Sequence, residues 1–423
     1  MKWQAAGPAA ADPAVAVPST DRRDNALSIL VITGEASGDL HGATLVRSLR
    51  QMAPQIECFG VGGDRMAGAG CELLYHMRHL AVVGITEVLR HLRDVRQALA
   101  TLTAAAAERR VDAVVLVDYP DFNLTLARRL RRALPGVPII YYISPQIWAW
   151  RAGRVSKIAR LVDSMLVILP FEEEIYASAG VPVTFVGHPL LDVVQFDSSR
   201  PQYAAKHGVA EAASWVGLLP GSRRAEIERL FPAMLSAARL LSGDSDLAFL
   251  VPVSCSVEKE VYARCLAQLP VDERERVHLV AGDHYATLQH SAVAAVCSGT
   301  ATLEAALADT PPVVVYRTSW LTYNLAKSLV HVRDIALVNL IAGRRAVPEL
   351  VQGAVTGPRL AHELRMLLED DARRRDVHTA LAEVRQRLGR PGASRRAAQA
   401  VLSLASGSHW RAPSAAGVAT PVA

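Results

Sequence analysis

Short apolar runs rich in β-branched residues alternate with helical patterns along most of this chain. The first run, 27–33, precedes apolar positions at helical spacing between Leu40 and Leu49, which predicts a buried strand followed by a helix. Similar runs predict strands at 56–60, 111–117, 138–143, 164–169, 183–186, 215–219, 247–253, 277–281, 293–297 and 312–316. Strands that alternate with helices form parallel sheets covered by helices on both faces. We therefore expect an α/β protein with two doubly wound, Rossmann-like domains facing a cleft.

The same pattern suggests the domain boundaries. Residues 1–26 are rich in Ala and Pro and lack the continuous apolar core of a signal peptide, and residues 406–423 have no periodicity either. We expect both tails to be disordered extensions. The first Rossmann-like domain is expected at 27–192 and the second at 193–372, with closing helices at 373–405.

Glycine-rich and polar turns follow several of these strands. Gly34-Glu-Ala-Ser-Gly-Asp39 comes after the first strand, but it is not a GxGxxG fingerprint, so no dinucleotide cofactor is indicated. Asp118-Tyr-Pro-Asp-Phe-Asn123 comes after the strand at 111–117. Ligands of parallel α/β sheets bind at such strand ends. Asp118 and Asp121 can each cap the following helix, which leaves at least one of them available for a ligand.

Two strand-to-helix turns in the second half have the composition of anion-binding sites. Pro220-Gly221-Ser222-Arg223 would place free N–H groups, a capping Ser222 and a guanidinium at a helix N-terminus, which suits a diphosphate. An ordinary connection with a capping serine explains the turn equally well. The second turn is Ser298-Gly-Thr-Ala-Thr-Leu-Glu304, in which Glu304 could accept hydrogen bonds from ribose hydroxyls or act in a capping box.

Composition and charge exclude several classes of protein. The 423 residues are 51% hydrophobic and 21% charged, as expected for a large globular protein. The net charge of +5 is spread along the chain, without the dense basic block typical of nucleic-acid binding. The five cysteines are odd in number and form no CxxC pair, which indicates a reducing compartment. No apolar run is long enough to span a bilayer, and no Asp/Glu/His cluster has metal-ligand spacing, so we expect activity without a divalent ion.

An apolar segment between Leu80 and Leu92 admits two interpretations. Ile85, Val88, Leu89 and Leu92 repeat at helical spacing, which is typical of a buried stripe. Leu80, Val82 and Val83 fall outside that stripe, and Arg90, His91 and Arg93 follow it. The alternative is therefore an exposed apolar patch with a basic border on a membrane surface.

A row of cations at 151–160 also has two interpretations. Arg151, Arg154, Lys157 and Arg160 recur every three residues, directly after Trp148 and Trp150. A solvated helix face is the simpler explanation. The amphipathic tryptophans favour contact with an anionic, lipid-like ligand.

Taken in order, these motifs resemble the lipid A disaccharide synthases, inverting glycosyltransferases of the two-Rossmann (GT-B) type. The resemblance runs from about residue 27 to 404. It is carried by Gly34-Glu-Ala-Ser-Gly-Asp39, Ala81-Val-Val-Gly-Ile85, Asp118-Tyr-Pro-Asp-Phe-Asn123, Ser144-Pro-Gln-Ile-Trp-Ala-Trp-Arg151, Leu219-Pro-Gly-Ser-Arg223, Ser298-Gly-Thr-Ala-Thr-Leu-Glu304 and Asn339-Leu-Ile-Ala-Gly-Arg344.

The resemblance implies transfer of 2,3-diacylglucosamine from UDP to the 6-hydroxyl of 2,3-diacylglucosamine 1-phosphate, giving a β-1,6-linked disaccharide and UDP in lipid A biosynthesis. It implies a peripheral protein on the cytoplasmic face of the inner membrane, which favours the membrane interpretation of the patch at 80–89. It also implies that the helices at 373–405 cross back onto the first domain, and that homodimers exchange C-terminal segments.

The resemblance assigns roles to individual positions. Expected donor-binding residues are Gly221, Ser222, Arg223, Ser298, Gly299, Thr300, Glu304, Asn339 and Arg344. Expected acceptor-binding residues are Ser37, Gly38, Asn123 and Gln146. Expected membrane contacts are Leu80, Val82, Val83, Ile85, Val88 and Leu89.

An inverting transfer needs a general base on the acceptor side, and the candidates are Asp121, Glu35 and His41. Asp121 is favoured because it follows a buried strand at a helix entry and matches the family's Asp-Phe-Asn motif. Glu35 could position a sugar hydroxyl, whereas His41 lies past the first helical turn and is expected to be structural.

Two other functions fit parts of the pattern. One is a UDP-sugar epimerase or hydrolase of the same fold, and the other is a non-catalytic, membrane-bound nucleotide-binding protein. The apolar patch argues against the first, because a soluble sugar nucleotide requires no such surface.

Overall fold

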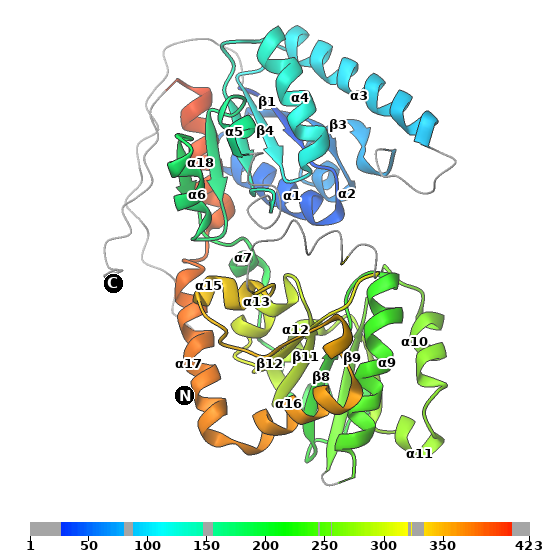
Figure 1. Ribbon diagram of the computed structural model, residues 1–423. Helices are drawn as coiled ribbons and strands as arrows, with labels where there is room; N and C mark the ends of the chain where they lie inside the picture. The colour runs from blue at the N-terminus through cyan, green and yellow to red at the C-terminus, as the bar shows by residue number, and fades with distance from the viewer. Residues whose placement is uncertain are drawn as a thin grey trace.

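The computed structural model describes residues 27–79, 88–146, 155–243, 246–254, 256–319, 323 and 334–407. Figure 1 shows two α/β domains, the first above the second, with α7 (Leu190–Val193) between them. Each domain is built around its own sheet, and all strand pairs in both sheets are parallel.

The first sheet has seven strands in the order β3-β2-β1-β4-β5-β6-β7. They are β1 (Ser28–Ile32), β2 (Glu57–Gly62), β3 (Glu72–His76), β4 (Ala113–Val117), β5 (Ile139–Tyr142), β6 (Ser164–Val167) and β7 (Val183–Phe185). β1 and β4 are neighbours, with Leu30 opposite Val114, and the chain winds outward from them in both directions. This pair is therefore the topological switch point of the sheet, where α/β proteins bind ligands.

Helices cover both faces of this sheet because its strands are apolar on both sides. In β1, Ile29 and Val31 face one core and Leu30 and Ile32 the other. The helices of this half are α1 (Ala36–Met52), α2 (Asp64–Gly68), α3 (Val88–Glu108), α4 (Pro120–Ala133), α5 (Val155–Ala159), α6 (Glu172–Ser178) and α7, with a 3-10 turn, η1, at Met77–His79.

The second sheet has six strands in the order β10-β9-β8-β11-β12-β13. They are β8 (Ser214–Leu219), β9 (Leu247–Val253), β10 (Val277–Ala281), β11 (Val293–Cys297), β12 (Pro312–Tyr316) and β13 (Glu349–Val351). Its switch point lies between β8 and β11, with Val216 opposite Val293.

The helices of the second half and the C-terminal segment complete the fold. They are α8 (Arg200–His207), α9 (Arg224–Leu241), α10 (Lys259–Leu266), α11 (Val271–Arg274), α12 (His284–His290), α13 (Ala301–Leu307), α15 (Leu337–Ala342), α16 (Gly357–Glu369), α17 (Asp371–Arg387) and α18 (Ala393–Ala405), with a 3-10 turn, η5, at Gln352–Ala354.

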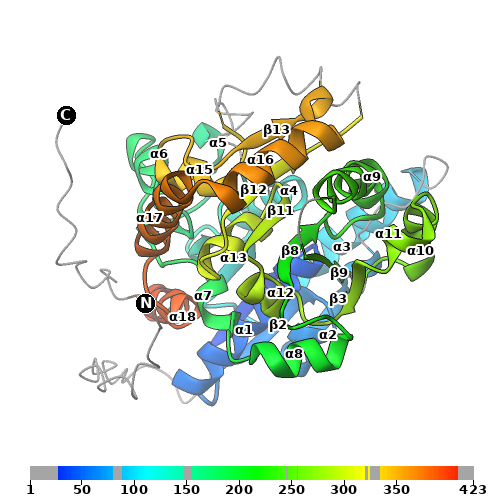
Figure 2. The same cartoon turned by 90° about the horizontal axis from the view of Figure 1, so that it is seen from below.

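The chain passes between the domains twice, and the two passages touch. α17 packs on α13 and α15 of the second domain, whereas α18 packs on α1 of the first, as Figure 2 also shows. The Asp192 carboxylate, next to the first passage, accepts hydrogen bonds from the backbone N–H groups of Gly392 and Ser394 in the second. Ser394 Oγ lies 3.1 Å from Thr44 Oγ1 of α1.

The predicted fold class, two doubly wound parallel-sheet domains, is confirmed. Two edge strands, β3 and β13, were not predicted from the sequence. β3 is mostly half-buried and β13 has three residues, so neither gives the fully apolar run of a central strand. In the part of the chain that the structure describes, no helix is both long and apolar enough to cross a bilayer.

Candidate active site

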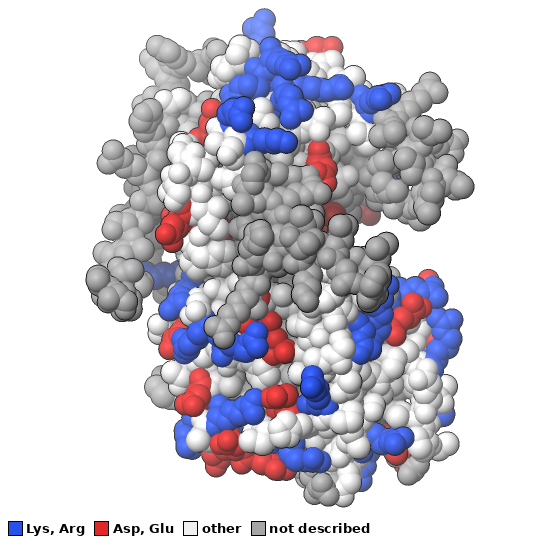
Figure 3. Space-filling model, viewed as in Figure 1, with Lys and Arg blue, Asp and Glu red and all other residues white. Residues whose placement is uncertain are grey.

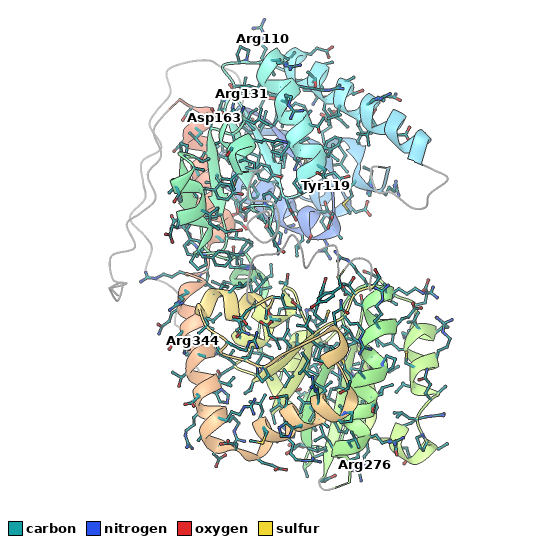
Figure 4. All side chains as sticks on the ribbon, in the orientation of Figure 1. Arg110, Tyr119, Arg131, Asp163, Arg276 and Arg344 are labelled. Atoms are coloured by element: carbon teal, nitrogen blue, oxygen red, sulfur yellow. The ribbon has the colours of Figure 1, made fainter. Side chains whose placement is uncertain are left out.

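The motif loops occupy equivalent positions in the two domains. Residues 34–39 and 118–123 follow β1 and β4, the strands at the first switch point, and residues 220–223 and 298–304 follow β8 and β11 at the second. Figure 4 places Tyr119 on the edge of the first domain that faces the second. Because α7 continues from the carboxyl side of the first sheet and lies between the domains in Figure 1, that sheet's ligand-binding edge faces the second domain.

The two loops of the first switch point interlock. Asp118 and Tyr119 both adopt left-handed backbone conformations, with φ of 45° and 48°. The Tyr119 ring lies directly over Gly34, where an added Cβ would come within 2.1 Å of the ring. Glycine is therefore required at position 34 for as long as the ring keeps this place.

Three carboxyl groups gather at this switch point. Burial raises the pKa of Asp118 to about 6, and the charge of Glu35 adds to the rise. Burial is also the main cause that raises the pKa of Tyr119, and the charges of Glu35 and Asp121 raise it further. Glu35 is exposed at the N-cap of α1, and Asp121 is exposed in the first turn of α4. The N-cap of α4 is Tyr119, so neither aspartate occupies the capping position that the sequence suggested for it.

The predicted acceptor residues differ in exposure. Ser37 and Gln146 are exposed, whereas Gly38 and Asn123 are buried. Asn123 Nδ2 donates to the backbone carbonyls of Asp118 at 2.6 Å and Val117 at 3.3 Å, so this amide stabilises the turn between β4 and α4. Acceptor binding by all four residues stays a prediction.

Asp39 has a structural role that sequence reasoning missed. Its carboxylate is 3% exposed and accepts hydrogen bonds from the backbone N–H groups of Gly63, Arg65 and Met66. It therefore joins the loop after β1 to the glycine turn after β2. This contact could have been predicted from the sequence, because an aspartate in the first turn of one helix is followed by a glycine turn at the end of the next strand.

His41 lies one turn into α1 and is half-buried, and its expected structural role stays a prediction. Burial lowers its pKa to about 4, against a partial rise from Asp192. The imidazole is therefore neutral at pH 7.

In the turn after β8, the backbone N–H groups that the sequence predicted to bind a diphosphate donate hydrogen bonds to a carboxylate. Glu226 Oε2 accepts from the backbone N–H of Ser222 at 3.0 Å and of Arg223 at 3.2 Å. The N-cap is Arg223, so the expectation that Ser222 caps α9 is wrong. The Arg223 side chain is 75% exposed, with its Nη1 3.6 Å from Glu226 Oε1, and it is the group of this turn best placed to meet a diphosphate.

The turn after β11 combines open space with a buried acid. Gly299 has φ of 145°, and nothing lies within 4 Å of a Cβ built there, so a ligand can approach the backbone. Ser298 Oγ donates to the Ile335 carbonyl at 3.3 Å, and Thr300 is exposed. Burial raises the pKa of Glu304 to about 7, and His284 Nε2 lies 4.0 Å from its Oε1.

The two remaining donor candidates are engaged within the fold. Asn339 is buried, donates to Val347 O and Glu349 Oε1, and accepts from the backbone N–H groups of Ala346 and Val347. Arg344 pairs with Glu383 of α17 at 2.6 Å, and Figure 4 shows it beside that helix. Donor binding by either residue stays a prediction.

One Asp-x-Asp triplet, Asp244-Ser-Asp246, directly precedes β9. Its last residue, Asp246, therefore lies at the amino end of the second sheet, opposite to the motif loops, and Asp244 and Ser245 lie outside the described residues. Within the described ranges, no three His, Cys, Asp or Glu residues are grouped so as to hold a metal ion. Activity without a metal stays a prediction.

The predicted membrane contacts cannot be placed. Leu80, Val82, Val83 and Ile85 lie outside the described residues, and Val88 and Leu89 belong to α3 without described side chains. Of the cation row, Lys157 and Arg160 are exposed, and Arg151 and Arg154 lie outside the described residues.

Two doubly wound domains, with motif loops at both switch points, define the two-Rossmann, GT-B type of fold. The family model described as lipid-A-disaccharide synthetase matches residues 29–404. The lipid-A-disaccharide synthase of Myxococcus xanthus is 46% identical over 377 residues, covering 89% of this chain and 97% of that protein. That of Syntrophus aciditrophicus is 44% identical over 381 residues, covering 90% and 98%.

The chain therefore belongs to the lipid-A-disaccharide synthase family, and it is a hexosyltransferase of lipid A biosynthesis. A solved UDP-N-acetylglucosamine 2-epimerase from Neisseria meningitidis, bound to UDP-GlcNAc, superimposes with a TM-score of 0.62 over 89% of this chain and 100% of its own. At 13% identity this likeness shows the fold alone. The match to the synthase family is what makes the epimerase and non-catalytic alternatives less favoured.

Proposed function

We propose that this chain transfers 2,3-diacylglucosamine from UDP to the 6-hydroxyl of 2,3-diacylglucosamine 1-phosphate. The observation that carries the proposal is the pairing of the two switch points. The second domain presents the exposed guanidinium of Arg223, free space beside the backbone of Gly299 and the buried carboxyl of Glu304. The first domain presents a group of carboxyls around Asp118. Cations suit the diphosphate that leaves, and carboxylates suit the hydroxyl that attacks.

The donor binds to the second domain. The Arg223 guanidinium meets the diphosphate, the backbone at Gly299 allows its close approach, and Glu304 accepts hydrogen bonds from the ribose hydroxyls. Ser298 and Thr300 line the same turn. Gly221, with φ of 118°, shapes the first turn, because a Cβ there would lie 2.3 Å from Glu226 Oε2.

The acceptor binds to the first domain, and Asp121 is the general base. The 6-oxygen of the acceptor forms a bond to C1 of the donor sugar while the bond from C1 to the UDP oxygen breaks. The hydroxyl proton passes to the Asp121 carboxylate, and the bonding electron pair leaves with UDP. An α-linked donor thus gives a β-linked product. Glu35, close to the same turn, positions a sugar hydroxyl.

Acceptor-dependent release of UDP tests this function. Asp121→Asn should lower kcat by roughly two to four orders of magnitude, the usual contribution of a general base, with UDP affinity and melting temperature unchanged. Asp376→Asn, an exposed aspartate of α17, is the control. Activity within a few-fold of wild type would pass the role to Glu35 or His41, and turnover without acceptor would indicate an epimerase or hydrolase instead.

The acyl chains of both substrates imply work at the inner-membrane surface. We infer that the segment at 80–89 contacts the bilayer and that cations of the first domain attract anionic head groups. Figure 3 shows Lys and Arg gathered at the end of this domain away from the second, over α4 and α5. The exposed members are Arg128, Arg129, Arg132, Lys157 and Arg160.

A homodimer with exchanged C-terminal segments is part of the same proposal. The contact between α18 and α1 forms within one chain here, and the same contact can form between two chains if the passage after α17 opens.

A further inference from the structure

The turn between β4 and α4 is held in a backbone conformation that its own residues disfavour. Asp118 and Tyr119, two consecutive non-glycine residues, have φ of 45° and 48°. Such conformations cost free energy and persist only where the surroundings fix them, and they gather at functional sites. Asp121 follows Tyr119 by two residues, in the first turn of α4. The direction of the Asp121 carboxylate therefore depends on the conformation of this turn.

Three hydrogen bonds fix the first residue of this turn. The Tyr141 hydroxyl donates to the Asp118 carbonyl at 2.6 Å, and Asn123 Nδ2 donates to the same oxygen at 2.6 Å. The Asp118 N–H donates to the carbonyl of Tyr142 at 3.2 Å. Tyr141 and Asn123 are both 0% exposed, so their bonds form away from competing water.

Tyr141 reaches the turn from the neighbouring strand. In the register of β4 and β5, it lies opposite Leu116, two residues before Asp118. Its ring belongs to the core between the sheet and α4, whereas Tyr142 faces the opposite core. A buried tyrosine needs some acceptor for its hydroxyl. Here the acceptor is the carbonyl of the residue where the left-handed conformation begins.

We propose that Tyr141 is a positioning residue for the transfer reaction. Its hydroxyl holds the Asp118–Tyr119 turn, and thereby sets the direction of Asp121 and the place of the Tyr119 ring over Gly34. The inference rests on the proposed function in which Asp121 takes the acceptor proton. Nothing in the motifs of the sequence marks Tyr141, which lies in a strand that precedes the Ser144-Pro-Gln motif.

The test compares Tyr141→Phe with Tyr142→Phe, a matched loss of one buried hydroxyl from the adjacent position. We expect Tyr141→Phe to lower kcat about 10- to 100-fold, with the donor KM and UDP affinity within two-fold of wild type. Tyr142→Phe should leave kcat within two-fold. Replacement of Tyr141 by 4-aminophenylalanine keeps an N–H donor at the same place and should restore most of kcat.

A double variant separates this inference from the base assignment. If Tyr141 acts through Asp121, then Tyr141→Phe should cause no further loss in an Asp121→Asn background. Equal kcat in Tyr141→Phe and Tyr142→Phe would overturn the inference while leaving Asp121→Asn free to support the function. A loss of kcat together with donor affinity and melting temperature, unrescued by the amine, would also overturn it, since that pattern marks a purely structural tyrosine. Full activity of Asp121→Asn alone would refute the base assignment instead.

Discussion

Glu304, the proposed ribose contact, links donor binding to stability because its carboxyl group is buried. Its side chain is 14% exposed, and burial raises its pKa from 4.5 to about 7. His284 does not compensate, since burial lowers the pKa of that imidazole and keeps it neutral near pH 7. We predict that Glu304→Gln stabilises the protein at alkaline pH and weakens its binding of UDP.

The size of the effect follows from the two pKa values. The unfolded chain loses its proton near pH 4.5, while the folded protein keeps it until about pH 7. At about 1.4 kcal/mol per pKa unit, wild type loses on the order of 3 kcal/mol of stability between these values and no more above pH 7. Glutamine resembles the protonated acid and does not titrate. The two proteins should therefore have similar stability near pH 5 and differ most at pH 8.

Thermal unfolding at pH 5 and pH 8 measures this difference, with Glu260→Gln, an exposed glutamate of α10, as the control. A gain on the order of 3 kcal/mol corresponds to roughly 6 to 12 °C in Tm for a domain of this size. Calorimetric titration with UDP at pH 8 should show affinity about 10- to 100-fold weaker, the loss of a hydrogen bond to a charged group. Parallel pH profiles of the two proteins would refute the burial argument, and unchanged UDP affinity would remove Glu304 from the donor site.

Two further outcomes are expected. Arg223→Ala should weaken UDP binding about tenfold or more in the same titration, whereas Arg224→Ala, which removes a cation paired along α9 with Glu228, should not; equal effects would mean general electrostatic attraction. Replacing Val82, Val83 and Ile85 by Ser should release the protein from anionic vesicles in a flotation assay without lowering Tm, and a collapse of Tm would show that these residues are core.

The fold was predictable because its central strands carry the strongest signal that a sequence can give. β1, β4 and β11 are fully buried apolar runs between helical patterns, and only parallel sheets bury strands on both faces. The strand order was not predictable from the same pattern. It became visible only once β1 was found beside β4, and β8 beside β11.

The turns of the candidate site were predictable because each motif directly follows a strand. The hydrogen bonds that side chains make to the backbone of those turns were not predictable. Gly221 and Arg223 were found by their turn, but the carboxylate of Glu226 on the N–H groups of that turn was not. The signal existed, since a glutamate at the third position of a helix often bonds back to the N-cap. Tyr141 gave no signal, because a tyrosine in a buried strand is ordinary until its hydroxyl partner is known.

The reaction must be decided by what the first domain presents, since solved epimerases share the two-sheet architecture at 13% identity. Here the charge of Glu35 acts on Asp118, and the charges of Glu35 and Asp121 both act on Tyr119. Burial, and then the charge of Glu35, raises the pKa of Asp118 to about 6. In the proposed donor site, Arg223 of the other domain stabilises the charge that develops on UDP. In the proposed mechanism, the proton moves to a carboxylate of the first domain and UDP leaves on the second, which is the direction that inverting transfer requires.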